Sequence, residues 1–368
     1  MCVACAWAHD SPVVPRHGGH PAGDRLWGRI FLAALALAFV AYLGGLWALR
    51  RNGAGKRAVL ALAAGIQLAP LAAPLLLSTD AWSYWSYARL DDPYSQTPSM
   101  DPVSAPHVGT DWLHWTSVYG PAFSLATEPA GATRSAAVAA WTFKIVAALC
   151  LVGLACWAAR RGAFAAAFVG WNPLLAVHFA GGGHNDGWMV ALVAGALALG
   201  ARGRVQAAGV AWALAAGVKW IPLLLLPLRA LEARAVGRRV GHLGFACTVV
   251  AVAVLATIVY GWDWLHALGP LARNANRETS YALPHRLHVP WPVFAAAYVP
   301  VYAWLAVQAA RGRARLGLAT CLLLVALPYL AAWYVVWAVP LAAVEEDRAA
   351  RLLALAFCAY LLPQTILT

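Results

Sequence analysis

The sequence predicts an all-α, polytopic membrane protein, and three features of the chain support this. Of its 368 residues, 62% are hydrophobic and only 11% are charged, whereas soluble domains carry about 25% charged residues. Its 19 Trp and 12 Tyr suit a protein with two membrane–water interfaces, where amphipathic aromatic rings settle. Long apolar runs recur along the chain, and strand patterns are absent. A water-soluble enzyme, a disordered chain and a disulfide scaffold are therefore excluded.

The apolar runs predict about 10 transmembrane helices, because a helical span needs about 20 apolar residues. Residues 1–26 lack the apolar core of a cleavable signal peptide and are expected to form an irregular segment. Residues 27–368 are expected to form a single membrane domain. The predicted spans are residues 26–49, 58–77, 136–158, 163–180, 187–200, 242–260, 290–310, 316–332, 335–344 and 352–367.

One further apolar segment, residues 205–228, has basic clusters on both of its flanks. If both flanks lie on the same side of the membrane, the chain must return, and this predicts a broken hairpin of two half-helices. Gly217 and Pro222 mark the expected break. Non-helical backbone at membrane depth is tolerated only against protein or a water-filled cavity, so the break indicates a cavity.

The distribution of charge predicts the orientation of the chain. The formal net charge is +12, but seventeen of the 27 Lys and Arg lie in six short clusters between apolar runs. This is the positive-inside pattern, so the basicity reflects topology and not a nucleic-acid partner. We expect a multi-pass protein of the plasma membrane, embedded in the lipid bilayer. The clusters are residues 50–57, 160–161, 202–204, 229–239, 311–315 and 348–351.

Two long polar stretches, at about residues 79–134 and 261–289, fall on the opposite, extracytoplasmic side by the same count. Nine of the fifteen Asp and Glu lie on that side. A loop as long as the first is uncommon and is usually functional. Both loops are expected to carry short helices.

Asp80 is the candidate general base of the first loop. It directly follows a predicted span, where burial is expected to raise its pKa toward the range of a general base. Tyr84 and Arg89 follow it at helical spacing and are candidate substrate-binding residues. The alternative fits its position equally well: an acid that caps a helix, with nearby aromatic side chains anchored among lipid headgroups.

Two aromatic motifs follow in the same loop. Tyr94 comes after Asp91, Asp92 and Pro93, and Tyr119 lies in residues 117–121. A Tyr ring offers a flat apolar face and a hydroxyl group, which suits a sugar ring. The alternative is that Pro and Gly simply mark turns of the loop.

His184, Asn185 and Asp186 follow three glycines between two apolar runs. Polar residues there are costly unless they are solvated or paired, and they mark function by default. A tight polar turn is the alternative. Two ligand types so close together, without further matched ligands, make a poor metal site.

Three cations are candidates for binding a phosphate group. Lys219 lies in the predicted broken hairpin, and either holds a phosphate in a cavity or extends to the membrane surface. His285 and Arg286 lie in the second loop, and either bind a lipid phosphate or anchor the loop to the membrane surface.

Taken in order, these motifs resemble the GT-C superfamily of polytopic glycosyltransferases. The resemblance is strongest to the bacterial polyprenol-phosphomannose-dependent α-1,6-mannosyltransferases. It covers most of the chain from about residue 58 onward, although Ala331 and Ala332 stand where a Pro is expected nearby. The motifs are Thr79-Asp80 with spaced Tyr, Asp92-Pro93-Tyr94, Tyr119-Gly120-Pro121, Gly183-His184-Asn185-Asp186 and the Trp333-Tyr334-Val335-Val336-Trp337 segment.

The resemblance implies an enzyme that moves a mannosyl residue from polyprenyl-phosphate-mannose to a growing lipomannan-type acceptor. The acceptor is then a glycan or glycolipid on the outer face, and the reaction inverts the anomeric centre. No cofactor is expected with certainty, and a divalent cation is left open. The implied roles are general base for Asp80, orientation of hydroxyls for His184, Asn185 and Asp186, lining of the cleft for Tyr119, and neutralisation of the leaving phosphate for Arg286, with Lys219 or His285 as weaker candidates.

Several alternatives stay open from the sequence. Asp91, Asp92 and Asp111 are rival bases, because a loop can fold any of them over a cleft. Another polyprenyl-phosphate-sugar transferase, such as an arabinofuranosyltransferase, is the nearest alternative activity. A lipid-linked-sugar transporter or flippase also uses broken helices, but it should place its polar residues at mid-membrane.

Overall fold

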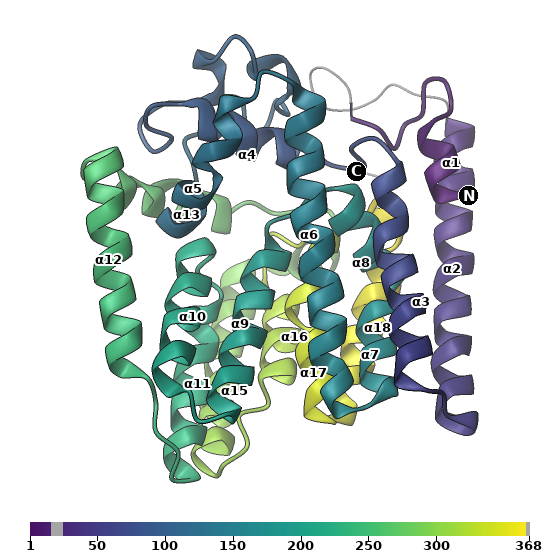
Figure 1. Cartoon of the computed structure of the whole chain (residues 1–368), viewed down its shortest axis with the longest axis vertical. Coiled ribbons are helices and arrows are strands. Elements are labelled where there is room, and N and C mark those ends of the chain that lie inside the picture. Colours follow the sequence, from purple (N-terminus) through teal and green to yellow (C-terminus); the bar gives the residue numbers. More distant parts are fainter. Residues whose placement is uncertain (16–24, 366–368) are drawn as a thin grey trace.

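The computed structural model describes residues 1–15 and 25–365, and every regular element within these ranges is a helix. Most helices lie side by side along the long axis of the molecule, with short helices over one end (Figure 1). The predicted all-α class is confirmed.

Four of the described helices are long and apolar enough to cross a membrane: α2 (Arg25–Asn52), α6 (Ala136–Ala158), α12 (His242–Tyr260) and α15 (Trp291–Ala310). A fifth span is reached if one bent pair of helices counts as a single crossing. These helices support a membrane protein, but the expectation of about 10 full-length spans is not met.

The other apolar runs form shorter helices, and proline interrupts two of them. Pro70 lies in the 3-10 turn η1 (Ala69–Ala72) that ends α3, and α16 stops two residues before Pro328. A residue before proline is disfavoured in helical conformation, so neither run continues as one helix. The shorter helices are α3 (Lys56–Leu68), α9 (Asp186–Ala201), α16 (Leu316–Ala326), α17 (Val339–Glu345), which follows the turn η8 (Ala332–Trp337), and α18 (Arg348–Leu361).

The run predicted as one span at residues 163–180 is bent by 48°. It consists of α7 (Ala163–Gly170), then α8 (Pro173–Ala176) and the π-helix η6 (Val177–Gly181). The side chain of Asn172 accepts hydrogen bonds from the backbone of α8, and Pro173 occupies its first turn. Both are typical of a new helix start, so the bend follows from the sequence.

The broken hairpin is confirmed. α10 (Val205–Val218) and α11 (Pro222–Ala235) are separated by three residues at Lys219, which has extended backbone. The short helix α5 (Pro121–Thr127) lies against the end of α10, where a Cβ atom on Gly120 would come within 2.2 Å of the Gly217 carbonyl oxygen. Only glycine allows this approach, which brings Tyr119 next to the break.

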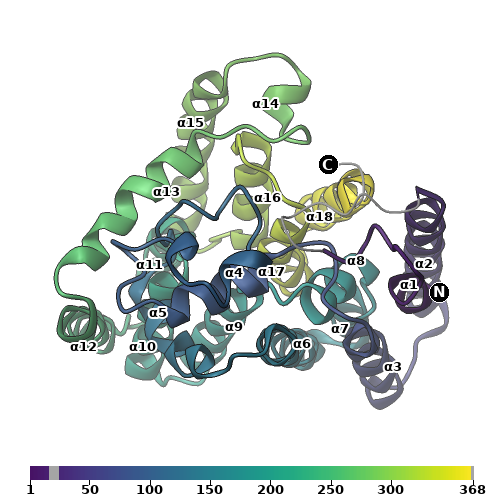
Figure 2. The same cartoon turned by 90° about the horizontal axis from the view of Figure 1, so that it is seen from above.

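Both long loops carry short helices, as predicted, and they lie over the same end of the bundle (Figures 1 and 2). We call this the capped end. The first loop contains α4 (Asp80–Arg89), α5 and the turns η2 (Pro98–Met100), η3 (Ala105–His107) and η4 (Glu128–Ala132), and the second contains η7 (Asp263–Ala267), α13 (Leu268–Ala275) and α14 (Leu283–Arg286).

The N-terminal segment, expected to be irregular, begins with the short helix α1 (Cys2–Ala6). Its residues 16–24 lie outside the described ranges. The indole Nε1 of Trp7 donates to the Ala72 carbonyl, and the Leu77 N–H donates to the Val13 carbonyl. The segment therefore contacts the chain that leads into α4.

Candidate functional site

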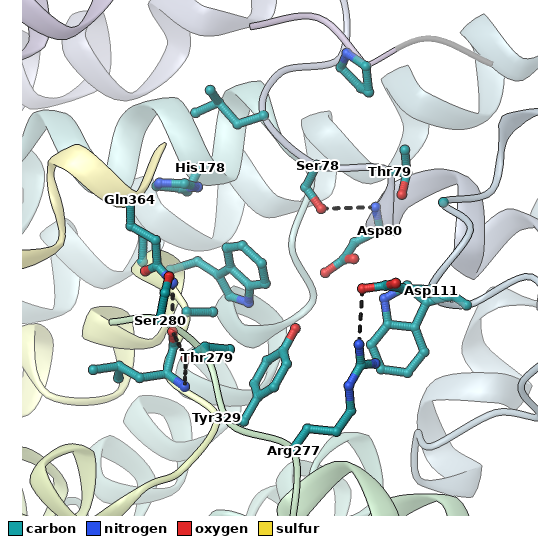
Figure 3. A pocket seen from close by; sticks show the side chains of 18 of the residues that line it. Ser78, Thr79, Asp80, Asp111, His178, Arg277, Thr279, Ser280, Tyr329 and Gln364 are labelled. Carbon is teal, nitrogen blue, oxygen red and sulfur yellow. Dashed lines mark hydrogen bonds and ion pairs between the residues drawn. The ribbon is translucent and has the colours of Figure 1, made fainter. Parts of the chain in front are cut away.

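Two adjoining cavities lie beneath the loops of the capped end, with volumes of about 440 and 150 Å³. Asp80, Trp112, Tyr329 and Trp333 line both of them. The Asp80 carboxylate and the Tyr329 hydroxyl point into the larger cavity (Figure 3). Asp80 therefore stands where the two cavities meet.

The two cavities differ in chemistry. The larger one is rich in polar side chains from both loops and from the bent helix pair, including Thr79, Asp111, His178, Arg277 and Thr279. The smaller one is mainly aromatic with a single lysine, and its walls include Tyr84, Tyr119, Lys219, Trp220, Tyr334 and Trp337.

Backbone contacts place Asp80 at this junction. The preceding segment is held by the Lys144 ammonium, which donates to the carbonyl of Ala73 at 2.5 Å and of Pro74 at 3.2 Å. The Leu76 N–H then donates to the Gly181 carbonyl at 3.0 Å. These bonds bring the start of α4 beside the polar turn that precedes α9.

Asp80 and His184 meet as a result of this arrangement. The Oδ2 atom of Asp80 lies 3.1 Å from Nδ1 of His184, and the Asp80 side chain is 15% exposed. The imidazole is buried and stacks on the Trp333 indole, with ring centroids 3.8 Å apart. Stacking fixes the plane of the ring, so the histidine holds the carboxylate in one orientation.

The expectation that the pKa of Asp80 is raised was wrong. Burial raises the pKa, but the hydrogen bond and electrostatic interaction with His184, the charge of Lys219 and a hydrogen bond with Ser78 together lower it below its usual value. Partners that stabilise the charged form outweigh desolvation here. Asp80 is therefore an ionised carboxylate, able to accept a proton from a hydroxyl group bound beside it.

Tyr84 and Asn185 complete the group around Asp80. The Tyr84 hydroxyl lies 3.4 Å from the Oδ1 atom of Asn185 and from its backbone nitrogen. Its ring packs edge-on against Tyr119, at 5.1 Å between centroids. Both tyrosines line the smaller cavity, and burial raises the pKa of each well above its usual value, so both hydroxyls stay protonated.

Asp186 and Lys219 form a buried ion pair deeper in the site. The Lys219 ammonium lies 2.7 Å from Oδ1 of Asp186, and the Trp337 indole donates to the same oxygen at 2.5 Å. Lys219 also lies over the rings of Tyr334, at 4.7 Å, and Trp337, at 5.4 Å. The ion pair joins the start of α9 to the break between α10 and α11.

Six of the predicted site residues line neither cavity. His184, Asn185 and Asp186 are fully buried and contact residues that do line one, whereas Arg89, His285 and Arg286 make their contacts elsewhere. Arg89 forms an ion pair with Asp101 at 2.5 Å and donates to two backbone carbonyls, so it fastens the first loop. His285 lies 3.5 Å from Glu278, and Arg286 lies over the Tyr281 ring; both are exposed.

The rival bases occupy different places. Asp111 lines the larger cavity and pairs with Arg277 at 3.0 Å, which links the two loops. Asp92 accepts hydrogen bonds from the Tyr94 N–H and the Ser95 hydroxyl within its own turn. Asp91 is exposed and lines neither cavity.

The sequence analysis missed several polar residues of the larger cavity, His178 and Arg277 among them. His178 is 2% exposed, and neither of its ring nitrogens has a hydrogen-bond partner within the described part of the chain. Its signal was a histidine inside an apolar run, the kind of residue that marks function by default. Arg277 carried no such signal, because it lies among other polar loop residues.

Within residues 1–15 and 25–365, no three His, Cys, Asp or Glu side chains gather so as to hold a metal ion.

Comparison with known proteins identifies the family. Residues 3–235 match the family described as alpha-(1->6)-mannopyranosyltransferase, N-terminal domain. Over 238 residues the chain is 31% identical to alpha-(1->6)-mannopyranosyltransferase A of Mycobacterium tuberculosis, covering 55% of this chain and 46% of that relative. The chain thus spans about half the length of the curated relative that it matches. No solved structure matches the chain significantly.

The matched residues include Asp80, His184 and Lys219, whereas Arg277 and Trp333 lie beyond them. The resemblance seen in the sequence motifs is confirmed. Because residues 3–235 make up more than half of the chain, the chain belongs to the alpha-(1->6)-mannopyranosyltransferase family.

Proposed function

We propose that this protein is an integral-membrane mannosyltransferase that uses polyprenyl-phosphate-mannose as donor and a lipomannan-type glycan or glycolipid as acceptor. The observation that carries the proposal is the position of Asp80, an ionised carboxylate at the junction of two cavities of different chemistry. Family membership supports the mannosyl transfer. The name of the matched relative supports the α-1,6 linkage.

In this reaction Asp80 acts as the general base. An alcohol is a poor nucleophile unless its proton is removed as the new bond forms. The acceptor hydroxyl oxygen forms a bond to the anomeric carbon, and its proton passes to the Asp80 carboxylate. The bond from that carbon to the phosphate oxygen breaks on the opposite face, and polyprenyl phosphate leaves with the electron pair. Attack opposite the leaving group inverts the configuration.

The leaving phosphate requires neutralisation of its charge more than a proton. Of the three cations named from the sequence, Lys219 is the one that lines a cavity containing Asp80. Arg277 lines the other cavity. Both cations support stabilisation of the charge that develops on the phosphate. Arg286 and His285 become secondary candidates, since they line neither cavity.

The remaining residues suit recognition of sugars. Tyr84 and Tyr119 give the smaller cavity flat aromatic faces and hydroxyl groups. His184 and Asn185 line neither cavity and support the site from behind, through their contacts with Asp80 and Tyr84. Aromatic faces with a few fixed hydrogen-bonding groups are typical of sites for small polar ligands. We place the capped end outside the cytoplasm, because the basic turns gather at the other end of the bundle (Figure 1).

The test is mannosyl transfer in membranes that contain the wild-type protein or one of three variants: Asp80→Asn, Asp91→Asn or Asp111→Asn. The donor is polyprenyl phosphomannose, and the acceptor is a short α-mannoside. We expect Asp80→Asn to lower the rate by about 10²- to 10⁴-fold at equal protein level. Asp91→Asn is the matched control and should keep full activity.

Other results would redirect the proposal. Transfer that survives Asp80→Asn but is lost in Asp111→Asn would make Asp111 the base. Transfer of arabinofuranose but not mannose from a polyprenyl phosphate would replace the donor. If no sugar is transferred while labelled lipid-linked sugar crosses the membrane, the protein is a transporter.

A further inference from the structure

A third cavity, of about 930 Å³, lies at the end of the bundle opposite the capped end. We call it the basal cavity. Five separate turns between helices contribute to its walls, and the capped end with α4 lies at the other end of the molecule (Figure 1). Its charged wall residues are Arg160, Arg161, Arg202, Arg229, Glu232, Arg238, Arg313, Arg315, Glu345, Glu346, Asp347 and Arg348.

The carboxylates of the basal cavity are mostly engaged. Glu232 pairs with Arg229, Asp347 pairs with Arg315 at 2.7 Å, and Glu345 accepts from the Gly317 N–H at 2.7 Å. The other arginines of the wall form no ion pair among the residues that the structure describes. These six are Arg160, Arg161, Arg202, Arg238, Arg313 and Arg348.

The positive-inside tendency accounts for basic residues on turns at one end of a bundle. It requires neither that they converge from several turns on one hollow nor that the hollow contain an apolar surface. The basal cavity has both features, since its arginines come from five turns and apolar side chains also line it. They include Trp157, Leu197, Leu316 and Val344.

We propose that the basal cavity binds an anionic phospholipid that carries at least two negative charges. Arginine binds phosphate oxygens through a planar fork of N–H donors, and six unpaired arginines match more than one phosphate charge. Basic pockets between membrane helices are known sites for lipid headgroups of this kind. The apolar wall residues suit the glycerol and upper acyl region, which a free phosphate ion lacks. The site is separate from Asp80, so the proposal does not rest on the proposed transferase activity.

The test is lipid binding by the purified full chain in a mild detergent, measured by native mass spectrometry and thermal unfolding. Cardiolipin is the dianionic probe, phosphatidylcholine the lipid without net charge, and pyrophosphate the soluble anion. The cavity variant carries Arg202→Gln and Arg238→Gln. The matched control carries Lys56→Gln and Arg57→Gln, which removes equal charge from exposed positions outside the cavity.

We expect the wild type and the control to bind cardiolipin with similar affinity. The cavity variant should bind it about 30-fold more weakly, since two arginines near the headgroup are lost. Equal weakening in both variants would overturn the proposal, because a general basic surface then suffices. If phosphatidylcholine binds as tightly as cardiolipin, binding does not depend on negative charge and the proposal is overturned. Pyrophosphate that displaces cardiolipin at equal concentration would make the ligand a soluble phosphate compound instead.

Discussion

The Oδ2 atom of Asp80 lies 3.1 Å from Nδ1 of His184, although 104 positions separate the two residues in the chain. The bond between the Leu76 N–H and the Gly181 carbonyl brings their two segments together, and Trp333 stacks on the imidazole. The residue proposed as the base is thus oriented by a residue from a distant motif. Three segments of the chain must fold correctly before the carboxylate takes its place.

The first prediction concerns pH. Because the pKa of Asp80 is lowered from its ordinary value of 3.8, the carboxylate stays ionised throughout the range in which transfer would be assayed. A base acts in its deprotonated form, so kcat/KM should lose nothing to protonation of Asp80 between about pH 5 and pH 8. Rates of mannosyl transfer in detergent or nanodiscs, measured across this range, check the prediction. An acidic limb in this interval that disappears in Asp111→Asn would show that Asp111, and not Asp80, is the titrating base.

The second prediction concerns the partner of that base. His184→Phe keeps a ring against Trp333 but removes the hydrogen bond to Asp80. Burial raises the pKa of Asp80, and without His184 this effect is opposed mainly by the charge of Lys219. The pKa of Asp80 therefore rises, and the acidic limb of the kcat/KM profile moves up toward neutral pH. The readout is the midpoint of the kcat/KM profile. His114→Phe, which changes an exposed histidine of the first loop, is the control and should leave the profile unchanged.

A purely structural role for His184 makes a different prediction. Activity would then fall equally at every pH, together with the amount of folded protein. A profile of unchanged shape in His184→Phe would count against the contact as a determinant of the pKa of Asp80.

Much of the fold could be predicted because the relevant signals are local. The helices at residues 136–158 and 242–260 begin and end where the apolar runs do. Gly217 and Pro222 flank the break of the hairpin, as expected from their effects on the backbone. The number of full spans was overestimated, since hydropathy alone does not register how proline divides a run, as at Pro328.

The site was predicted in part for the same reason. Asp80 and the residues from His184 to Asp186 stand out as polar groups beside apolar runs, and the structure brings them together. The direction of the pKa shift depends on a partner more than 100 positions away, which no local pattern reveals. Arg277 could not be distinguished from Arg286 by sequence, although only Arg277 lines a cavity with Asp80.

The third prediction concerns the buried ion pair. Lys219→Met leaves Asp186, whose side chain is 1% exposed, without its cation. An uncompensated buried charge lowers the free energy of unfolding by about 3–5 kcal/mol. Thermal unfolding in detergent should show this as a lower Tm, whereas Lys56→Met at an exposed position should change little.

The double variant Lys219→Met with Asp186→Asn provides the internal check. It removes the orphaned charge but keeps an oxygen for the Trp337 indole to donate to. Stability should therefore recover in part. A double variant no more stable than Lys219→Met would mean that lost packing against Tyr334 and Trp337, and not charge, explains the effect.

The fourth prediction concerns the contact between α5 and α10. Gly120 has ordinary backbone angles for any residue, with φ of −70°, so space alone restricts it to glycine. A Cβ atom there would lie 2.2 Å from the Gly217 carbonyl oxygen, which is backbone and cannot rotate away. Gly120→Ala must therefore push α5 from the break and move Tyr119 in the smaller cavity. Overpacking of this kind costs about 1–3 kcal/mol.

Gly153→Ala is the matched control, because a Cβ atom at Gly153 meets nothing within 4 Å and the residue lies inside α6. Alanine favours a helix interior over glycine by about 0.5–1 kcal/mol, so this variant should be as stable as the wild type or slightly more so. Mannosyl transfer should fall in Gly120→Ala and persist in Gly153→Ala. If Gly120→Ala keeps full stability and full activity, the position of Tyr119 in the smaller cavity does not depend on this close approach.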